Sequence, residues 1–188
     1  LYDSIGRVEI IGGEPLMQIG FVTELFEAAK ARGIHTCLDT SGITFRPDSP
    51  GILAQFDRLA AVTDLVLLDI KHIDPVGHPA LCSQPQAPVL AFAAYLERKG
   101  IPVWIRHVVV PGITDRQEHL YRLGQYLATL KNVKALDVLP YHDMGKVKYH
   151  SLGIPYALED VPPLSGEDAR RARAVILQCF RDRRMENG

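Results

Sequence analysis

Short runs of apolar residues alternate along this chain with longer segments in which apolar side chains recur every three or four positions. The short runs predict β-strands at residues 8–11, 35–38, 65–68, 103–105 with a continuation to 110, and 135–139. The longer segments predict helices at residues 21–32, 52–61, 88–99, 114–130 and 165–183. Strands and helices that alternate in this way are typical of βαβ units in a parallel sheet.

Residues that start and stop helices support these boundaries. Gly33 and Gly100 follow two of the predicted helices, where a residue with positive φ is favoured. Capping boxes are predicted at the starts of two others, by Thr114 with Gln117 and by Ser165 with Asp168. Residues 74–88 and 141–163 are rich in turn-forming residues, and both are predicted to be loops.

Composition and charge limit the possible functions. The 188 residues are 47% apolar and 23% charged, which predicts a single globular domain over 1–188. A net charge of −1 gives no reason to expect a nucleic-acid partner, and no apolar run has membrane-spanning length. The three cysteines, Cys37, Cys82 and Cys179, are scattered and odd in number, which favours a reducing, cytoplasmic location.

Each predicted strand is followed by polar or glycine residues. In strand order they are Gly12, Gly13 and Glu14; Asp39 and Thr40; Asp69 and Lys71; Arg106 and His107; and Tyr141, His142 and Asp143. In parallel α/β folds the carboxyl ends of the strands gather on one side, and binding groups collect there. The sequence therefore predicts a ligand site built from several strand ends.

Each of these groups also has a purely structural explanation. The two glycines could form an ordinary turn, and residues 39–42 could form a helix N-cap or a turn. Asp69 could form an ion pair with Lys71, Arg106 could extend to solvent, and His142 could be a hydrogen-bonded loop residue. No single one decides the function, but their recurrence at successive strand ends favours a common site.

The residue types indicate what such a site would bind. Glu14, Asp39 and Asp69 suit an ammonium group or a cation, whereas Lys71 and Arg106 suit a carboxylate, and His142 could join them. Two carboxylates with nearby oxygen atoms could also form a hard-cation site. The chain has no glycine-rich phosphate-binding motif, so an amino acid derivative fits better than a phosphate.

Five segments together resemble one known family. They are Gly12-Gly13-Glu14-Pro15; residues 35–42, HTCLDTSG; residues 64–71, DLVLLDIK; Val103-Trp104-Ile105-Arg106 with Val109-Val110-Pro111-Gly112; and Leu139-Pro140-Tyr141-His142 with Gly145-Lys146. In this order they resemble the pyruvate formate-lyase-activating enzymes, which are glycyl-radical enzyme activases of the radical S-adenosylmethionine superfamily. The resemblance runs from about Val8 to Tyr149.

The resemblance implies a fold, an activity and partners. The fold would be α/β, a partial (β/α)6 TIM-like barrel of parallel strands. A [4Fe-4S] cluster would bind S-adenosylmethionine and accept an electron from a reductant such as flavodoxin or ferredoxin. The resulting 5′-deoxyadenosyl radical would remove hydrogen from a glycine of pyruvate formate-lyase.

The resemblance also implies roles for individual residues. The main chain at Gly12, Gly13 and Glu14 would hold the methionine amino group. Asp39, Thr40, Asp69 and the carbonyl of Leu67 would surround a monovalent cation, and Lys71, Arg106 and His142 would contact the cofactor. No residue of this chain is assigned a catalytic role.

One feature of the family is missing from the sequence. The chain contains no Cys-x3-Cys-x2-Cys segment to hold the cluster. We expect that the 188 residues are the C-terminal part of an activase that lacks its first βα unit, and that they are inactive alone. Two alternatives remain open. One is a cluster-free domain that binds S-adenosylmethionine or a partner, and the other is an unrelated barrel aldolase or metal hydrolase that uses Asp39, Asp69, Lys71 and His142.

Overall fold

The computed structural model describes residues 6–10 and 13–186, and strands alternate with helices along them. In chain order the elements are β1 (Arg7–Ile10), the 3-10 helix η1 (Pro15–Gln18), α1 (Ile19–Lys30), β2 (His35–Thr40), α2 (Pro50–Ala60), β3 (Leu65–Asp69), α3 (Gly77–Cys82), α4 (Ala87–Arg98), β4 (Val103–Val109), α5 (Gln117–Thr129), β5 (Val133–Pro140), α6 (Gly145–Ser151) and α7 (Gly166–Glu186). All the predicted strands and helices are present, with shifts of a few residues at their ends.

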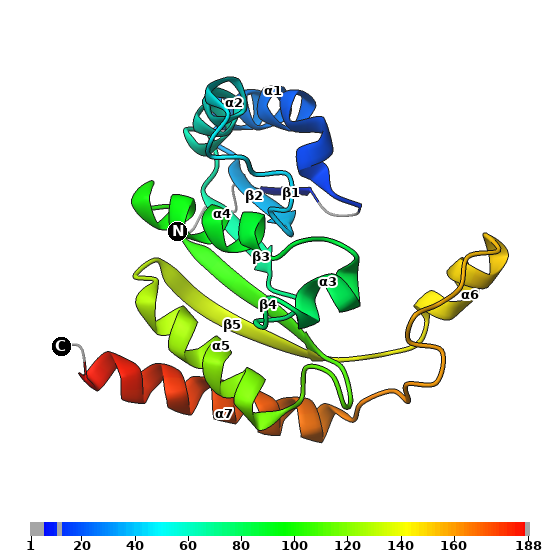
Figure 1. Ribbon diagram of the computed structural model, residues 1–188. Coiled ribbons are helices and arrows are strands. Elements are labelled where there is room, and N and C mark those ends of the chain that lie inside the picture. Colours follow the sequence, from blue (N-terminus) through cyan, green and yellow to red (C-terminus); the bar gives the residue numbers. More distant parts are fainter. Residues whose placement is uncertain (1–5, 11–12, 187–188) are drawn as a thin grey trace. The chain divides into compact units, whose positions relative to one another are not determined.

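The strands form one parallel sheet in the order β1-β2-β3-β4-β5 (Figure 1). In the pair β1–β2 Arg7 lies opposite His35, and in the pair β2–β3 Cys37 lies opposite Leu65. Sequential parallel strands with intervening helices are the arrangement of a TIM-like barrel. The predicted fold class, α/β with a partial barrel of parallel strands, is confirmed.

Two compact units divide the described residues between them. The first comprises Leu1–Ile70, Pro85–Ile105 and Leu130–Ala135, and the second comprises Lys71–Gln84, Arg106–Thr129 and Leu136–Gly188. Strands β4 and β5 each begin in the first unit and end in the second. The prediction of a single domain stays a prediction, and the units are described separately below.

An aromatic cluster forms the core of the first unit. The ring of Phe45 lies 4.9 Å from that of Phe56 and 5.4 Å from that of Phe92, centroid to centroid. Leu38 and Val66, which pair in register on β2 and β3, line a small cavity together with Phe56 and Phe92. Even-numbered positions of these strands therefore face the helices α2 and α4, and burial of these side chains holds strands and helices together.

Close contact between α5 and α7 characterises the second unit. The two helices run side by side (Figure 1), and a Cβ atom added to Gly124 would lie 2.5 Å from the main-chain oxygen of Ile176. Only glycine permits this approach, because any side chain would collide with the facing backbone. By contrast, α6 contains no buried residue.

Several predicted helix ends are confirmed. Gly33 and Gly100 have φ values of +70° and +69° and follow α1 and α4. At the start of α7 the hydroxyl of Ser165 donates to the carboxylate of Asp168 at 2.6 Å, and the main-chain N–H of Asp168 donates back to that hydroxyl at 3.1 Å. Ser165 thus caps α7 through its hydroxyl, whereas the carboxylate of Asp168 accepts that hydroxyl instead of the main-chain N–H that a capping box uses.

Other local predictions were wrong. The hydroxyl of Thr114 accepts the N–H of Val110 at 2.7 Å and donates to the carbonyl of Val108, so it closes the turn after β4 instead of capping a helix with Gln117. The predicted loops 74–88 and 141–163 contain the short helices α3 and α6. None of the helices in the described residues combines the length and apolar character that spanning a membrane requires.

Candidate functional site

The turn after β1 is joined to the end of β2 by the side chain of Glu14. Its Oε1 accepts the hydroxyl of Thr40 at 2.5 Å and the main-chain N–H of Leu16 at 3.2 Å. Its Oε2 accepts both the N–H of Ser41 at 3.0 Å and the hydroxyl of Ser41 at 2.5 Å. Two segments 26 residues apart in sequence thus form one hydrogen-bonded structure in the first unit.

Two buried carboxylates lie on one face of the sheet at the ends of β2 and β3. Asp39 stands opposite Leu67, and Asp69 follows Leu67 by two positions, so alternation directs all three side chains to the same face. This is the face opposite α2 and α4, because Leu38 and Val66 point toward those helices. Asp39 and Asp69 are only 9% and 8% exposed, and both have polar or charged interactions.

The turn after β2 is fixed by packing as well as by hydrogen bonds. Gly42 has a φ of +70°, and a Cβ there would lie 2.5 Å from Cδ1 of Phe92. The N–H of Gly42 donates to the hydroxyl of Thr40 at 2.9 Å. Residues 39–42 are therefore not a helix cap: Asp39 and Thr40 end β2, and Ser41 and Gly42 begin the turn that follows the buried carboxylate.

Gly13 leaves its main chain open to approach. It has a φ of +58°, it is exposed, and no atom lies within 4 Å of the position a Cβ would occupy. Such backbone can contact a ligand directly, because no side chain stands in the way. Gly12, which was predicted to act with it, lies outside the described residues.

The remaining predicted residues belong to the second unit. Lys71 follows β3 and is half-buried; Arg106 is half-buried in β4 between the buried residues Ile105 and His107; and His142 is exposed just after β5. Lys71 and His142 lie just after the carboxyl ends of their strands, as expected. The expectation that Arg106 follows its strand was wrong, because β4 continues to Val109. That they meet the first-unit carboxylates stays a prediction.

A histidine cluster in the second unit was not predicted. Nδ1 of His72 accepts the N–H of Asp74 at 3.0 Å, and the His72 ring lies 4.6 Å from that of His119, edge to face. Burial and the neighbouring His119 lower the pKa of His72 to about 4, so this buried imidazole is neutral at pH 7. His72 lies in the loop after β3 and His119 lies in α5, so no shared position in the sequence pattern marked them as neighbours.

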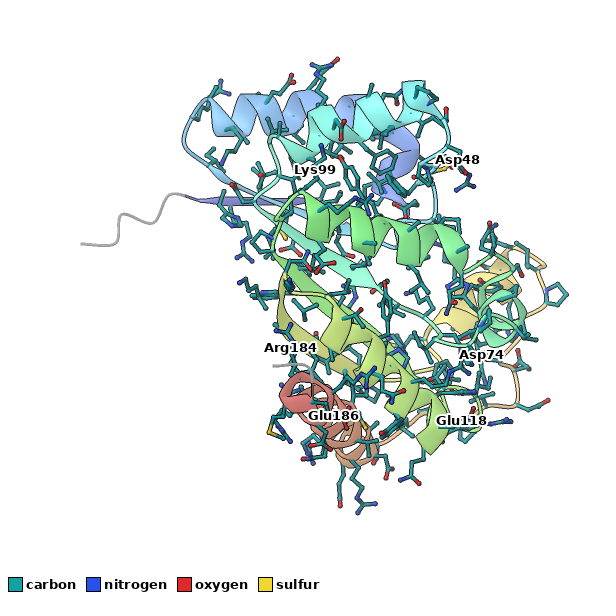
Figure 2. All side chains as sticks on the ribbon, turned by 60° about the vertical axis from the view of Figure 1, so that its left-hand side comes forward. Asp48, Asp74, Lys99, Glu118, Arg184 and Glu186 are labelled. Carbon is teal, nitrogen blue, oxygen red and sulfur yellow. The ribbon has the colours of Figure 1, made fainter. Side chains whose placement is uncertain are left out.

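Asp74 lies between His72 and α3 and stabilises the start of that helix. Its carboxylate accepts the N–H groups of Gly77 and Val76 and pairs with Arg122 at 2.9 Å; these contacts, Gly77 first, lower its pKa to about 2. Asp74 and Glu118, both labelled in Figure 2, flank that arginine. They line a pocket of about 450 Å³ with His72, His119, Arg122 and Leu158.

The cysteines do not form an iron–sulfur site. Cys37 is fully buried in β2 of the first unit, and burial raises the pKa of its thiol to about 11. Cys179 is buried in α7 and Cys82 half-buried in α3, both in the second unit. Among the described residues, no three His, Cys, Asp or Glu side chains are grouped so as to hold a metal ion.

Comparisons with known proteins indicate the family to which the chain belongs. A family model described as the Radical SAM superfamily matches residues 2–124. The pyruvate formate-lyase-activating enzyme of Streptococcus mutans is 49% identical over 175 residues, which are 93% of this chain and 66% of that protein. That of Listeria monocytogenes is 48% identical over 173 residues, 92% of this chain and 69% of that protein.

A solved structure supports the fold. The crystal structure of a domain of pyruvate-formate lyase-activating enzyme from Bacteroides vulgatus superimposes with a TM-score of 0.73 over 93% of this chain and 94% of that one, at 20% identity. The chain belongs to the radical SAM superfamily. Its relatives group it there with the pyruvate formate-lyase-activating enzymes, of whose length it spans about two thirds. The hypothesis of an unrelated aldolase or hydrolase is therefore wrong.

Membership of this superfamily implies S-adenosylmethionine and a [4Fe-4S] cluster, and the two fit this chain differently. The cysteines present do not fit the cluster, since they are buried or dispersed over two units. The methionine end of the cofactor fits the first unit, where open main chain at Gly13 and the buried Asp39 and Asp69 offer partners for an ammonium group and for a cation.

Proposed function

We propose that this chain is the S-adenosylmethionine-binding part of an activase that acts on pyruvate formate-lyase. The observation that carries the proposal is the 44–49% identity, over about 92% of the chain, to proteins named pyruvate formate-lyase-activating enzyme. At such identity the residues of a binding site can be compared position by position, and the strand-end groups described above are those that the family resemblance selects.

In this proposal the first unit holds the amino group of the cofactor. The main chain of Gly12, Gly13 and Glu14 accepts hydrogen bonds from the ammonium group. The exposed, positive-φ backbone at Gly13 supports this assignment, because a ligand can approach it without meeting a side chain.

The buried carboxylates of Asp39 and Asp69 are proposed to hold a monovalent cation beside the cofactor carboxylate. Their placement on the same face of adjacent strands supports this role, since a cation between them would offset their repulsion. The carbonyl of Leu67 and the main-chain oxygen of Thr40 complete the set. The hydroxyl of Thr40 already donates to Glu14 and accepts from Gly42, so the main-chain oxygen is the assignment we propose.

Lys71, Arg106 and His142 are proposed to contact the cofactor or to line its cavity. Lys71 and His142 follow strands of the same parallel sheet as Asp39 and Asp69, and Arg106 lies within β4 of that sheet. Positive side chains there would balance the cofactor carboxylate and the acidic pair.

When bound, S-adenosylmethionine supplies, on one-electron reduction, the oxidant that removes a hydrogen atom from a glycine of the partner. Because the cysteines of this chain do not fit a cluster, we propose that a segment outside these 188 residues provides the ligands. The electron donor would be a flavodoxin or ferredoxin, and the location cytoplasmic, in keeping with three cysteines that form no disulfide.

One observation favours a second candidate. The misfit of the cysteines to a cluster would also be found in a cluster-free domain that binds S-adenosylmethionine or a partner protein without radical chemistry. The two candidates differ in whether the protein, completed with a cluster segment, transfers a radical.

Radical transfer gives the decisive experiment. The 188-residue chain, and the same chain extended by the sequence that its gene encodes upstream, are incubated anaerobically with iron, sulfide, a reductant, S-adenosylmethionine and pyruvate formate-lyase. We expect a glycyl-radical electron paramagnetic resonance signal with the extended chain and none with the 188 residues. A cluster-bearing extended chain that binds S-adenosylmethionine but gives no signal would overturn the activase proposal.

A further inference from the structure

The carboxylate of Glu14 is already saturated with hydrogen bonds. A carboxylate has about four acceptor positions. The four donors described above are the N–H of Leu16, the hydroxyl of Thr40, and the N–H and hydroxyl of Ser41. No acceptor position is left for a ligand, so the side chain and the main chain of this residue must have different tasks.

Thr40 and Ser41, which donate hydrogen bonds to Glu14, lie next to the candidate ligand site. Thr40 and Ser41 follow Asp39 directly. Their hydroxyls also accept the N–H groups of Gly42 and Ile43, at 2.9 and 3.4 Å, so each hydroxyl links Glu14 to the next turn. Packing of Gly42 against Phe92 holds that turn from its other side. The direction in which β2 ends therefore depends on both contacts.

We propose that Glu14 is a positioning residue that acts through Thr40 and Ser41. Its side chain fixes the distance between the open main chain at Gly13 and the carboxylate of Asp39. A ligand with an ammonium group and a carboxylate meets both places at once, and preorganisation of the two lowers the cost of binding. This inference rests on the proposed binding of S-adenosylmethionine.

The hydrogen bonds of Glu14 require a carboxylate on a side chain as long as that of glutamate. A glutamine would present one oxygen and an NH2 group, and the NH2 group cannot accept from Ser41. An aspartate is one methylene shorter and could not span to both residues. The E14Q variant keeps the shape of the side chain but removes the charge and one of the two acceptor oxygens, so it is the sharpest test.

Two measurements distinguish a positioning role of Glu14 from direct contact of its side chain with S-adenosylmethionine. The first is the amide hydrogen exchange rate of Ser41 by NMR, and the second is the Kd for S-adenosylmethionine by calorimetry. In E14Q we expect Ser41 to exchange faster and the Kd to rise, each about tenfold, because a buried hydrogen bond to a charged group is lost. The control E24Q removes the same charge from the exposed surface of α1 and should change neither.

The S41A variant tests whether the two residues act as a unit. Because S41A removes only a single hydroxyl, it can be used to test the proposal if E14Q does not fold. We expect S41A to raise the Kd about threefold, and the double variant E14Q/S41A to bind no more weakly than E14Q, since coupled residues are not additive. Effects that multiply in the double variant would overturn the proposal.

The remaining outcomes are equally informative. A raised Kd in E14Q with unchanged Ser41 exchange would make Glu14 a direct ligand, and faster exchange with unchanged Kd would make it a structural contact only; either overturns positioning. If the wild-type chain bound no S-adenosylmethionine, the proposed function would fail with the inference. If the wild-type chain bound it and E14Q bound it equally well, the inference alone would fail.

Discussion

Asp39 of β2 lies directly opposite Leu67 of β3 in the parallel register. Because Asp69 follows Leu67 by two positions, the two aspartates share one face of the sheet, on the side away from α2 and α4. Two acids that are more than 90% buried on one face repel each other unless a positive charge lies nearby. The predictions about the ligand site follow from this pair.

Monovalent cations should strengthen binding of S-adenosylmethionine. Replacing sodium and potassium with choline, a much larger cation, should raise the Kd about tenfold, equivalent to ~1.4 kcal/mol. In the D39N variant the Kd should no longer depend on the cation. Calorimetry in the two buffers measures this, and a cation effect that survives in D39N would place the cation elsewhere.

His72 should make the stability of the protein depend on pH. Its folded pKa, about 4, lies below the unfolded value of about 6.5. Above pH 6.5 the His72 imidazole is neutral in both the folded and the unfolded state, and its contribution to stability is fully present. As the pH falls from 6.5 to 4, His72 becomes protonated in the unfolded chain but stays neutral in the folded one. Stability is therefore lost, by on the order of 2–3 kcal/mol in total.

Urea unfolding at several pH values measures this slope. The H72Q variant should flatten it, whatever its absolute stability, because the titrating group is gone. H150Q removes an exposed histidine that contacts Glu159 at the surface and serves as the control. An H72Q slope equal to that of the wild type would show that other groups produce the pH dependence.

Gly124 should tolerate no side chain. An alanine there would place its Cβ 2.5 Å from the oxygen of Ile176 and 2.8 Å from Cβ of Cys179, so α5 and α7 would have to separate. We expect G124A to reduce the free energy of unfolding by about 1–3 kcal/mol. G51A is the matched control in α2, where nothing lies within 4 Å, and it should be neutral or stabilising by up to ~1 kcal/mol. Equal denaturation midpoints for the two variants would contradict this account of the helix contact.

The three cysteines should differ sharply in reactivity. Cys82 is half-buried, whereas Cys37 and Cys179 are buried and burial raises the pKa of both thiols. With a chromogenic disulfide at pH 8 we expect one fast thiol per folded chain, absent in C82S, and two more only after unfolding. A fast phase that persists in C82S would show that one of the core thiols is accessible.

Periodicity in the sequence was enough to predict the sheet. Strands such as β3 are apolar at every position because both faces are covered, and the first polar residue after such a run marks the strand end. For this reason the end of β3 was predicted to within one residue: Asp69 was expected to follow the strand and is its last residue. Asp39 and Thr40 were expected to follow their strand, but they are its last two residues.

The short helices could not be predicted in the same way. α3 is held by the carboxylate of Asp74, which accepts two N–H groups near its start, and by the αL residue Ser83 at its end, and neither contact produces an apolar period. α6 buries no residue and so has no apolar stripe to recognise.

The contact of Glu14 with Ser41 could not be predicted either, because it joins residues 27 positions apart through side-chain geometry. A sequence can indicate that an acid follows two glycines and that hydroxyls end the next strand. It does not indicate that these groups meet.

Calorimetric titration of S-adenosylmethionine into the 188-residue chain and into its D39N/D69N variant tests the central claim most directly. We predict saturable binding at one site in the wild-type chain and a Kd raised at least about 30-fold in the variant, with amide spectra showing both proteins folded. Equal binding by the two proteins would contradict the account, since the strand-end acids would then have no part in holding the ligand.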